Sequence, residues 1–86
     1  MEDTKVIKVL LLSSQEIVVS EIAVIAAEVG DPNCKLTKPY KIEGGALHKW
    51  MQDYTEQNEI MINSDKIVTL VTPSPMIFEK YSKVTS

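Results

Sequence analysis

The chain of 86 residues is long enough for one small domain, and 44% hydrophobic and 24% charged residues are typical of a folded protein. A net charge of −3 and the lack of arginine argue against general nucleic-acid binding, which needs clustered cations. The single cysteine, Cys34, cannot form an internal disulfide, and no apolar run is long enough to span a bilayer. We therefore expect one cytoplasmic domain over residues 1–86, without a signal peptide.

The first part of the chain predicts a β-hairpin. Residues 6–12 form an apolar, β-branched run, the polar stretch 13–16 predicts a turn, and residues 17–22 return to the β-branched pattern. Residues 20–29 are compatible with either a strand or a helix, because Ser20 and Gly30 could also cap a helix. We predict a strand there, ending in a tight turn over residues 30–33.

The middle of the chain predicts a further strand and an extended segment. Residues 35–42 alternate in polarity, and Pro39 lacks a backbone donor, so we expect a sheet edge or a bulge at that position. Gly44 and Gly45 interrupt the chain. Residues 47–54 then predict a strand or an irregular extended segment, in which His48 and Trp50 would share a face.

The last third predicts two strands and a helix. Residues 60–62 and 67–71 are apolar and flank a polar turn, which favours a hairpin. Ser74 followed by Pro75 is typical of a helix start, and apolar residues follow at helical spacing. A short C-terminal helix is therefore expected after a mostly β domain.

Catalysis is not expected from this sequence. One histidine, one cysteine and scattered carboxylates provide no pair of ligands at zinc spacing. Phosphate-binding loops and nucleophile elbows have no counterpart either. We predict a non-enzymatic protein that needs no metal and no cofactor.

Three segments of the chain resemble the Sm-like (LSm) family, particularly its members encoded by tailed phages of marine cyanobacteria. They are VIKVLLLSSQEIVVSEI at 6–22, KLTKP at 35–39 and IMINSDKIVTLV at 60–71. The resemblance implies a small, strongly bent, five-stranded, SH3-like open barrel, to which the short helix is added. It also implies a homo-oligomeric ring of about five to seven copies, closed by strand edges.

The same resemblance implies candidate RNA-binding positions. RNA-binding Sm-like proteins carry Asp-x-x-apolar-Asn after the second strand and Arg-Gly between the last two strands. Here residues 31–33 have a different spacing, and Asn63-Ser64 stands in place of Arg-Gly. An asparagine cannot supply the charge or the stacking plane of an arginine. The RNA-binding candidates are Asp31, Asn33, Lys35, Asn63, Ser64 and Lys66.

Two functions remain open at this point. We expect a ring-forming scaffold that contacts phage or host proteins in the cytoplasm of an infected bacterium. The alternative is an RNA-binding Sm-like chaperone. In both cases the interface between copies would use residues of the later strands and the segment around the tryptophan: Leu47, Trp50, Met51, Ile67, Val68, Thr69 and Leu70.

Overall fold

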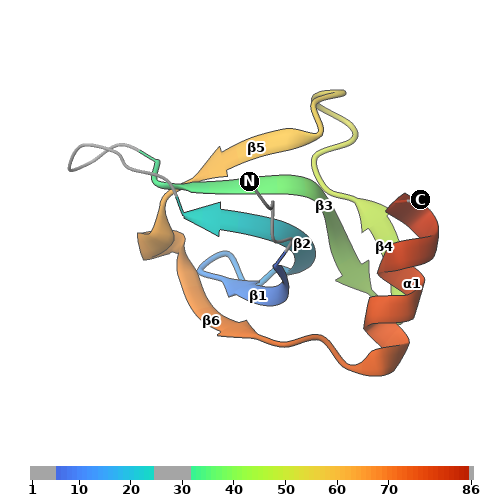
Figure 1. Cartoon of the computed structure of the whole chain (residues 1–86). Coiled ribbons are helices and arrows are strands. Elements are labelled where there is room, and N and C mark those ends of the chain that lie inside the picture. The colour runs from blue at the N-terminus through green and yellow to red at the C-terminus, as the bar shows by residue number, and fades with distance from the viewer. Residues whose placement is uncertain (1–5, 25–31, 86) are drawn as a thin grey trace, which may run out of the picture.

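A computed structural model of the chain describes residues 6–24 and 32–85. Within these ranges the protein is mostly β, with six strands, one short 3₁₀ turn and a C-terminal helix (Figure 1). The elements are β1 (Ile7–Leu12), β2 (Ile17–Val24), β3 (Cys34–Glu43), β4 (Ala46–Lys49), β5 (Glu59–Ile62), η1 (Ser64–Lys66), β6 (Ile67–Val71) and α1 (Pro75–Thr85).

All strand pairs are antiparallel and belong to one sheet with the order β4-β3-β2-β1-β6, while β5 pairs separately with β3. The sheet has six strands instead of the predicted five, because two short strands share one edge of β3. It is neither closed nor strongly curled. The mostly β fold and the helix are confirmed, whereas the predicted barrel is not.

The N-terminal hairpin is confirmed. β1 and β2 pair from Ile7 opposite Glu21 to Leu11 opposite Ile17, around the predicted polar turn. Leu10 and Val18 face each other in this pair and are fully buried. The strand predicted over residues 20–29 is confirmed as far as Val24. The rest of that prediction, and the first half of the turn at 30–33, lie outside the described residues.

A bulge lies at Pro39, as its missing N–H group predicts. The register between β2 and β3 shifts between Val19 and Glu21, and Lys38 has a left-handed φ of 55°. The buried Ser20 fits into this irregular position, where its hydroxyl donates to the Thr37 carbonyl at 3.1 Å. β3 is nevertheless an inner strand and not an edge.

The bulge divides the outer side of β3 into two halves. Residues 34–37 pair with β5, and residues 40–43 pair with β4 through a hairpin at Gly44 and Gly45. Both glycines have positive φ, as this tight hairpin requires. The extended segment predicted over 47–54 ends at Lys49, because residues 50–54 turn back and the Tyr54 N–H donates to the Met51 carbonyl.

The hairpin predicted from residues 60–62 and 67–71 is wrong, although both strands form. β5 pairs with β3, whereas β6 pairs with β1 on the other side of the sheet. The physical reason is the 3₁₀ turn η1, which redirects the chain. The side chain of Asn63 caps this turn by accepting from the Asp65 N–H at 3.0 Å.

The predicted C-terminal helix is confirmed as α1, with Ser74 as its N-cap: the Ile77 N–H donates to the Ser74 hydroxyl at 3.3 Å. Tyr81 fixes the helix to the bulge. Its buried hydroxyl accepts from the Glu21 N–H at 3.1 Å and donates toward the Lys38 carbonyl at 2.8 Å. The helix therefore lies against the irregular region of the sheet and beside β4 (Figure 1).

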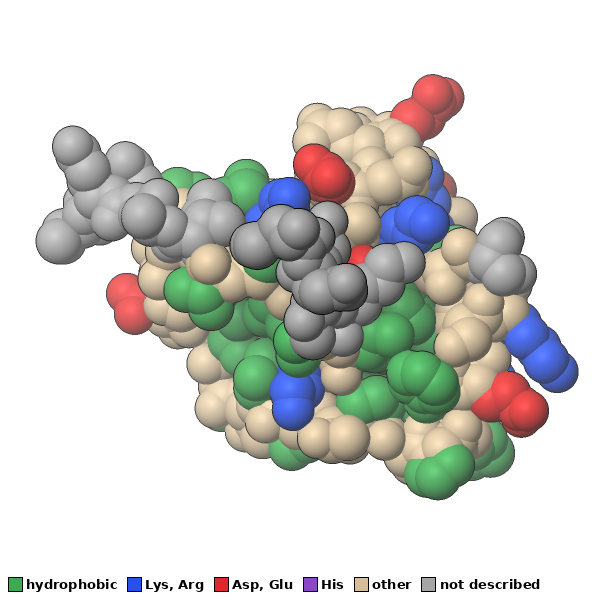
Figure 2. All heavy atoms as spheres, viewed as in Figure 1, with side chains coloured by type: hydrophobic (Ala, Val, Ile, Leu, Met, Phe, Trp, Pro, Cys, Tyr) green, Lys and Arg blue, Asp and Glu red, His purple; other side chains and the backbone are tan. Residues whose placement is uncertain are grey.

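The hydrophobic core is small. It consists of Leu10, Leu12, Val18 and Leu36, against which four partly buried side chains pack, namely Ile22, Trp50, Ile62 and Ile67. Among the described residues, more large hydrophobic side chains are exposed than buried. Figure 2 shows hydrophobic side chains gathered over the middle of one face and at the lower right, where α1 begins. The monomer leaves much apolar surface in water.

Candidate functional site

Two of the predicted RNA-binding residues bind each other. Asn33, which precedes β3, accepts from the Ser64 N–H at 2.9 Å and donates from its amide nitrogen to the Ser64 hydroxyl at 3.2 Å. Both polar atoms of the Asn33 amide are therefore engaged in joining the loop before β3 to the turn η1. Asn33 therefore connects two loops, and its amide is less able to form hydrogen bonds with an RNA base.

A third loop joins this cluster through the backbone. The Lys66 N–H donates to the Asn63 carbonyl at 2.9 Å, and the Lys66 carbonyl accepts from the Ser13 N–H at 2.8 Å. The turn after β1, the loop before β3 and the turn before β6 thus meet at one end of the sheet. Of the predicted RNA-binding set, the structure brings Asn33, Asn63, Ser64 and Lys66 together, while Asp31 lies outside the described residues.

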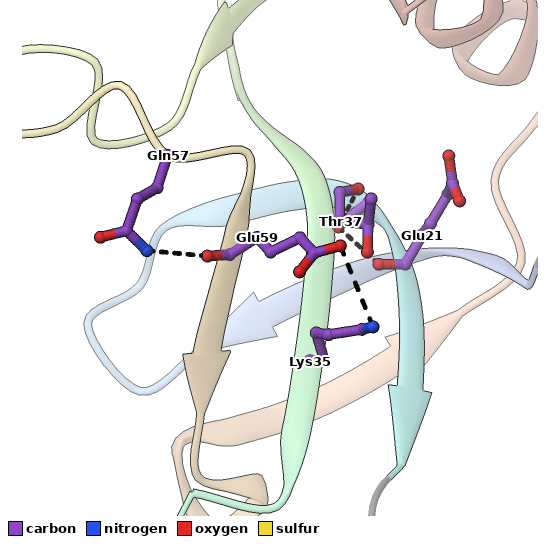
Figure 3. A network of polar contacts seen from close by, with 6 residues as sticks. Glu21, Lys35, Thr37, Gln57 and Glu59 are labelled. Carbon is purple, nitrogen blue, oxygen red and sulfur yellow. Dashed lines mark hydrogen bonds and ion pairs between the residues drawn. The ribbon is translucent and has the colours of Figure 1, made fainter.

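Lys35 is directed elsewhere. Its ammonium lies 4.0 Å from a carboxylate oxygen of Glu59, so that it crosses from β3 to β5 (Figure 3). Gln57 donates to the Glu59 carbonyl at 3.0 Å in the same view. The side chains of Lys35 and Glu59 are 38% and 63% exposed, so water screens the ion pair and it contributes little stability.

Replacing Asn33 by alanine should loosen the junction between the loops. The substitution removes two hydrogen bonds to Ser64, and we expect it to lower the free energy of unfolding by about 1 kcal/mol. Urea unfolding followed by circular dichroism measures the change. Asn58→Ala is the matched control, since Asn58 is an exposed asparagine whose side chain makes no hydrogen bond within the described residues; an equal or larger loss for that variant would contradict the structural role of Asn33.

The predicted interface residues form two groups at opposite ends of the strand order. Leu47 is in β4 and Trp50 and Met51 follow it, whereas residues 67–70 are in β6 at the other end of the strand order. Every β6 residue after Ile67 is exposed, with Val68 at 63% and Leu70 at 45%. Two different groups on one molecule suit a head-to-tail contact between copies, although Trp50 and Ile67 pack against the same core.

The two sides differ in what already covers them. α1 lies beside β4, and the Lys80 ammonium donates to the Gly45 carbonyl at 2.7 Å. Leu47 lines a hollow shared with this helix, and Trp50 packs against the core. Among the described strands, β4 and β5 each pair only with β3 and β6 pairs only with β1, so each has an unpaired second edge. Of these three strands, β4 is the one beside which α1 lies.

Two hollows were not predicted from the sequence, although the predicted interface residues Trp50 and Met51 line the first of them. One, of about 370 Å³, is lined by residues 48–54 together with Glu16, Lys41 and Glu43. A 3.6 Å ion pair between Lys41 and Glu16 joins its walls. The other is apolar, has a volume of about 620 Å³ and lies where β6 ends and α1 begins. Sequence reasoning missed both, because each collects residues from segments distant in the chain.

The described residues lack two further features. No group of three or more His, Cys, Asp or Glu side chains within 6–24 and 32–85 could hold a metal ion. In the same ranges, no helix has both the length and the apolar character to cross a membrane.

Burial raises the pKa of the Cys34 thiol, which keeps this side chain in its less reactive, protonated form.

Comparison with known proteins gives one result. No curated protein matches the chain. One family model matches residues 5–86, which is nearly the whole length, and this family has no assigned function. The match identifies the chain neither as an Sm-like protein nor as a phage protein. By this match the chain belongs to the family of unknown function DUF6561.

Proposed function

We propose that this protein is a non-enzymatic, Sm-like protein of the kind encoded by tailed phages, which assembles into a homo-oligomeric ring and acts as a scaffold for phage or host proteins. The observation that carries this proposal is that β5 and β6 each have an edge that no other strand of the described residues pairs with. An unpaired strand edge presents backbone donors and acceptors that another strand can satisfy. Two such edges on one molecule allow each copy to pair with two neighbours.

The chain path supports an Sm-like arrangement. A 3₁₀ turn separates the last two strands, and β6 returns to pair with β1 instead of with β5. The two strands therefore lie apart within one copy. In a ring, β5 of one copy would continue the sheet of the next copy through β6, and the small open sheet would become a closed assembly.

The exposed apolar surface supports assembly as well. Val68 and Leu70 of β6 and Met61 of β5 are exposed, although the core of the single chain is small. Leu70 is paired with the fully buried Leu10, so it extends the core to the open edge of the sheet. A neighbouring copy on this edge would complete the core and remove apolar surface from water.

RNA binding is the second candidate function, and one observation favours it. Asn63, Ser64 and Lys66 meet Asn33 at one end of the sheet, where a ring would repeat the cluster in every copy. The engagement of the Asn33 amide by Ser64 counts against base recognition. We therefore rank the scaffold above the RNA chaperone.

Light scattering combined with RNA titration tests the two candidates. We expect one discrete oligomer in solution, with little change in fluorescence anisotropy when short oligo-U or oligo-A is titrated at low salt. An RNA affinity that is strong and falls steeply as salt rises would favour the chaperone, because released counterions drive phosphate binding. A strict monomer at all concentrations would contradict both forms of the proposal.

A further inference from the structure

The hollow at the end of β6 is lined mainly by apolar side chains. Its walls are the start of β1, the segment that leaves β6 and the first two turns of α1, and the residues are Ile7, Thr72, Pro73, Pro75 and Phe78. Its volume of about 620 Å³ is within the range of sites that bind ligands or side chains. Because Thr72 directly follows β6 and Ile7 begins β1, the hollow lies at the end of the β1–β6 pair.

A large aromatic side chain precedes the other open edge. Tyr54 is 82% exposed, in the turn that leads from β4 to β5. Its N–H donates to the Met51 carbonyl at 2.9 Å, so that the turn holds this position. Tyrosine is enriched at protein interfaces, since it buries a large ring and offers a polar hydroxyl at the rim.

Antiparallel pairing would bring these two features together. When β5 of one copy pairs in antiparallel fashion with β6 of the next, the residues before β5 lie beside the residues after β6. Tyr54 precedes β5, and the apolar hollow follows β6. The edge pairing therefore places the aromatic side chain of one copy at the hollow of its neighbour.

The charges of the two surfaces are complementary. Around Tyr54, residues 50–58 contain Asp53 and Glu56 and no lysine, while the carboxylate of the following Glu59 pairs with Lys35 of the same chain. At the hollow, the Lys8 ammonium donates to the Thr72 hydroxyl at 3.1 Å and provides a positive charge at the rim. Opposite charges at the edge of an apolar contact favour this orientation of two copies over the reverse one.

We propose that Tyr54 of one copy inserts into the apolar hollow of the next copy and fastens the β5–β6 contact between them. This inference rests on the proposed function, because it needs the edge pairing of neighbouring copies. It adds an anchor residue and its receptor to that pairing, and it sets the direction in which copies follow one another.

Disulfide trapping tests the inference. A chain with Tyr54→Cys and Thr72→Cys should give, after mild oxidation, a ladder of covalent oligomers on a non-reducing gel that ends at the size of the ring. Cys34 is buried and does not compete. The control pairs Tyr54→Cys with Val24→Cys, since Val24 is also highly exposed (78%) but lies away from the hollow; it should remain without the ladder.

Tyr54→Ala provides a second readout that does not depend on oxidation. We expect the dissociation constant between copies to rise roughly tenfold or more, as for other buried aromatic anchors, while Tyr54→Phe retains most of the affinity. If the wild type assembles, the cysteine pair gives no specific ladder and Tyr54→Ala leaves the affinity between copies unchanged, the anchor role of Tyr54 is contradicted. The ring proposal would then still stand. A wild-type protein that does not assemble would overturn both.

Discussion

Lysine at both Val68 and Leu70 should convert the assembled protein into folded monomers. These side chains are exposed on β6, where each lysine would place a charge on the open edge of the sheet. Charged residues on an edge strand oppose pairing with another strand, and the apolar contact with the neighbouring copy would be lost as well. We expect the affinity between copies to fall about 100-fold or more.

Sedimentation velocity measures this dissociation, and circular dichroism verifies that the β fold is retained. Val24→Lys is the matched control for Val68→Lys, because each replaces one exposed valine with one lysine and Val24 lies on β2, not on an open edge. The single variant Val68→Lys is needed because a lysine at Leu70 could unfold β6 locally, since the strand partner of Leu70 is the core residue Leu10. Assembly of both lysine variants at wild-type strength would contradict the role of β6.

Tyr81→Phe should cause a loss of stability. The substitution leaves the Glu21 N–H and the Lys38 carbonyl without the hydroxyl that joins them in a buried place. An unsatisfied buried polar group typically costs about 1–3 kcal/mol. Tyr40→Phe is the control, because the Tyr40 hydroxyl makes one exposed, 3.3 Å bond to the Val84 carbonyl. Urea unfolding at neutral pH should show a clearly smaller loss for the control.

The same hydroxyl should make stability depend on alkaline pH. Burial is the main cause that raises the pKa of Tyr81 to about 12, from the ordinary value of 10.0. The folded protein therefore holds this proton more tightly than the unfolded chain. The contribution of Tyr81 to stability is complete below pH 10.0 and is lost as the pH rises toward about 12.

Urea unfolding at several pH values between neutrality and strong alkali measures this loss. Because phenylalanine has no proton to release, the difference in stability between the wild type and Tyr81→Phe should shrink above pH 10.0. A constant difference over the whole range would show that the hydroxyl is not coupled to folding in this way.

Local patterns were sufficient for much of the fold. The β-branched runs predicted β1 and β2, the proline predicted the bulge in β3, and the Ser74-Pro75 pair predicted the start of α1. These features depend on neighbours in the chain, such as a missing N–H group or a capping hydroxyl. The partners of β5 and β6 do not depend on neighbours in the chain, since two strands flanking a short turn can pair with each other or with distant strands.

The candidate site was also only partly predictable from the sequence. The resemblance pointed to Asn33, Asn63 and Ser64, and the structure does place them at one end of the sheet. Their hydrogen bonds to one another could not be read from spacing, because they depend on the path of η1. The apolar hollow could not be predicted either, since Ile7 and Phe78 meet there only after β6 has returned to β1.

Native mass spectrometry of the wild-type protein at low micromolar concentration tests the central claim most directly. The chain has a mass of 9.6 kDa, so a closed ring appears as one integer multiple of that mass, and we predict a single species of about five to seven copies. A spectrum that contains only the 9.6 kDa monomer would contradict the claim that the open edges of β5 and β6 join neighbouring copies.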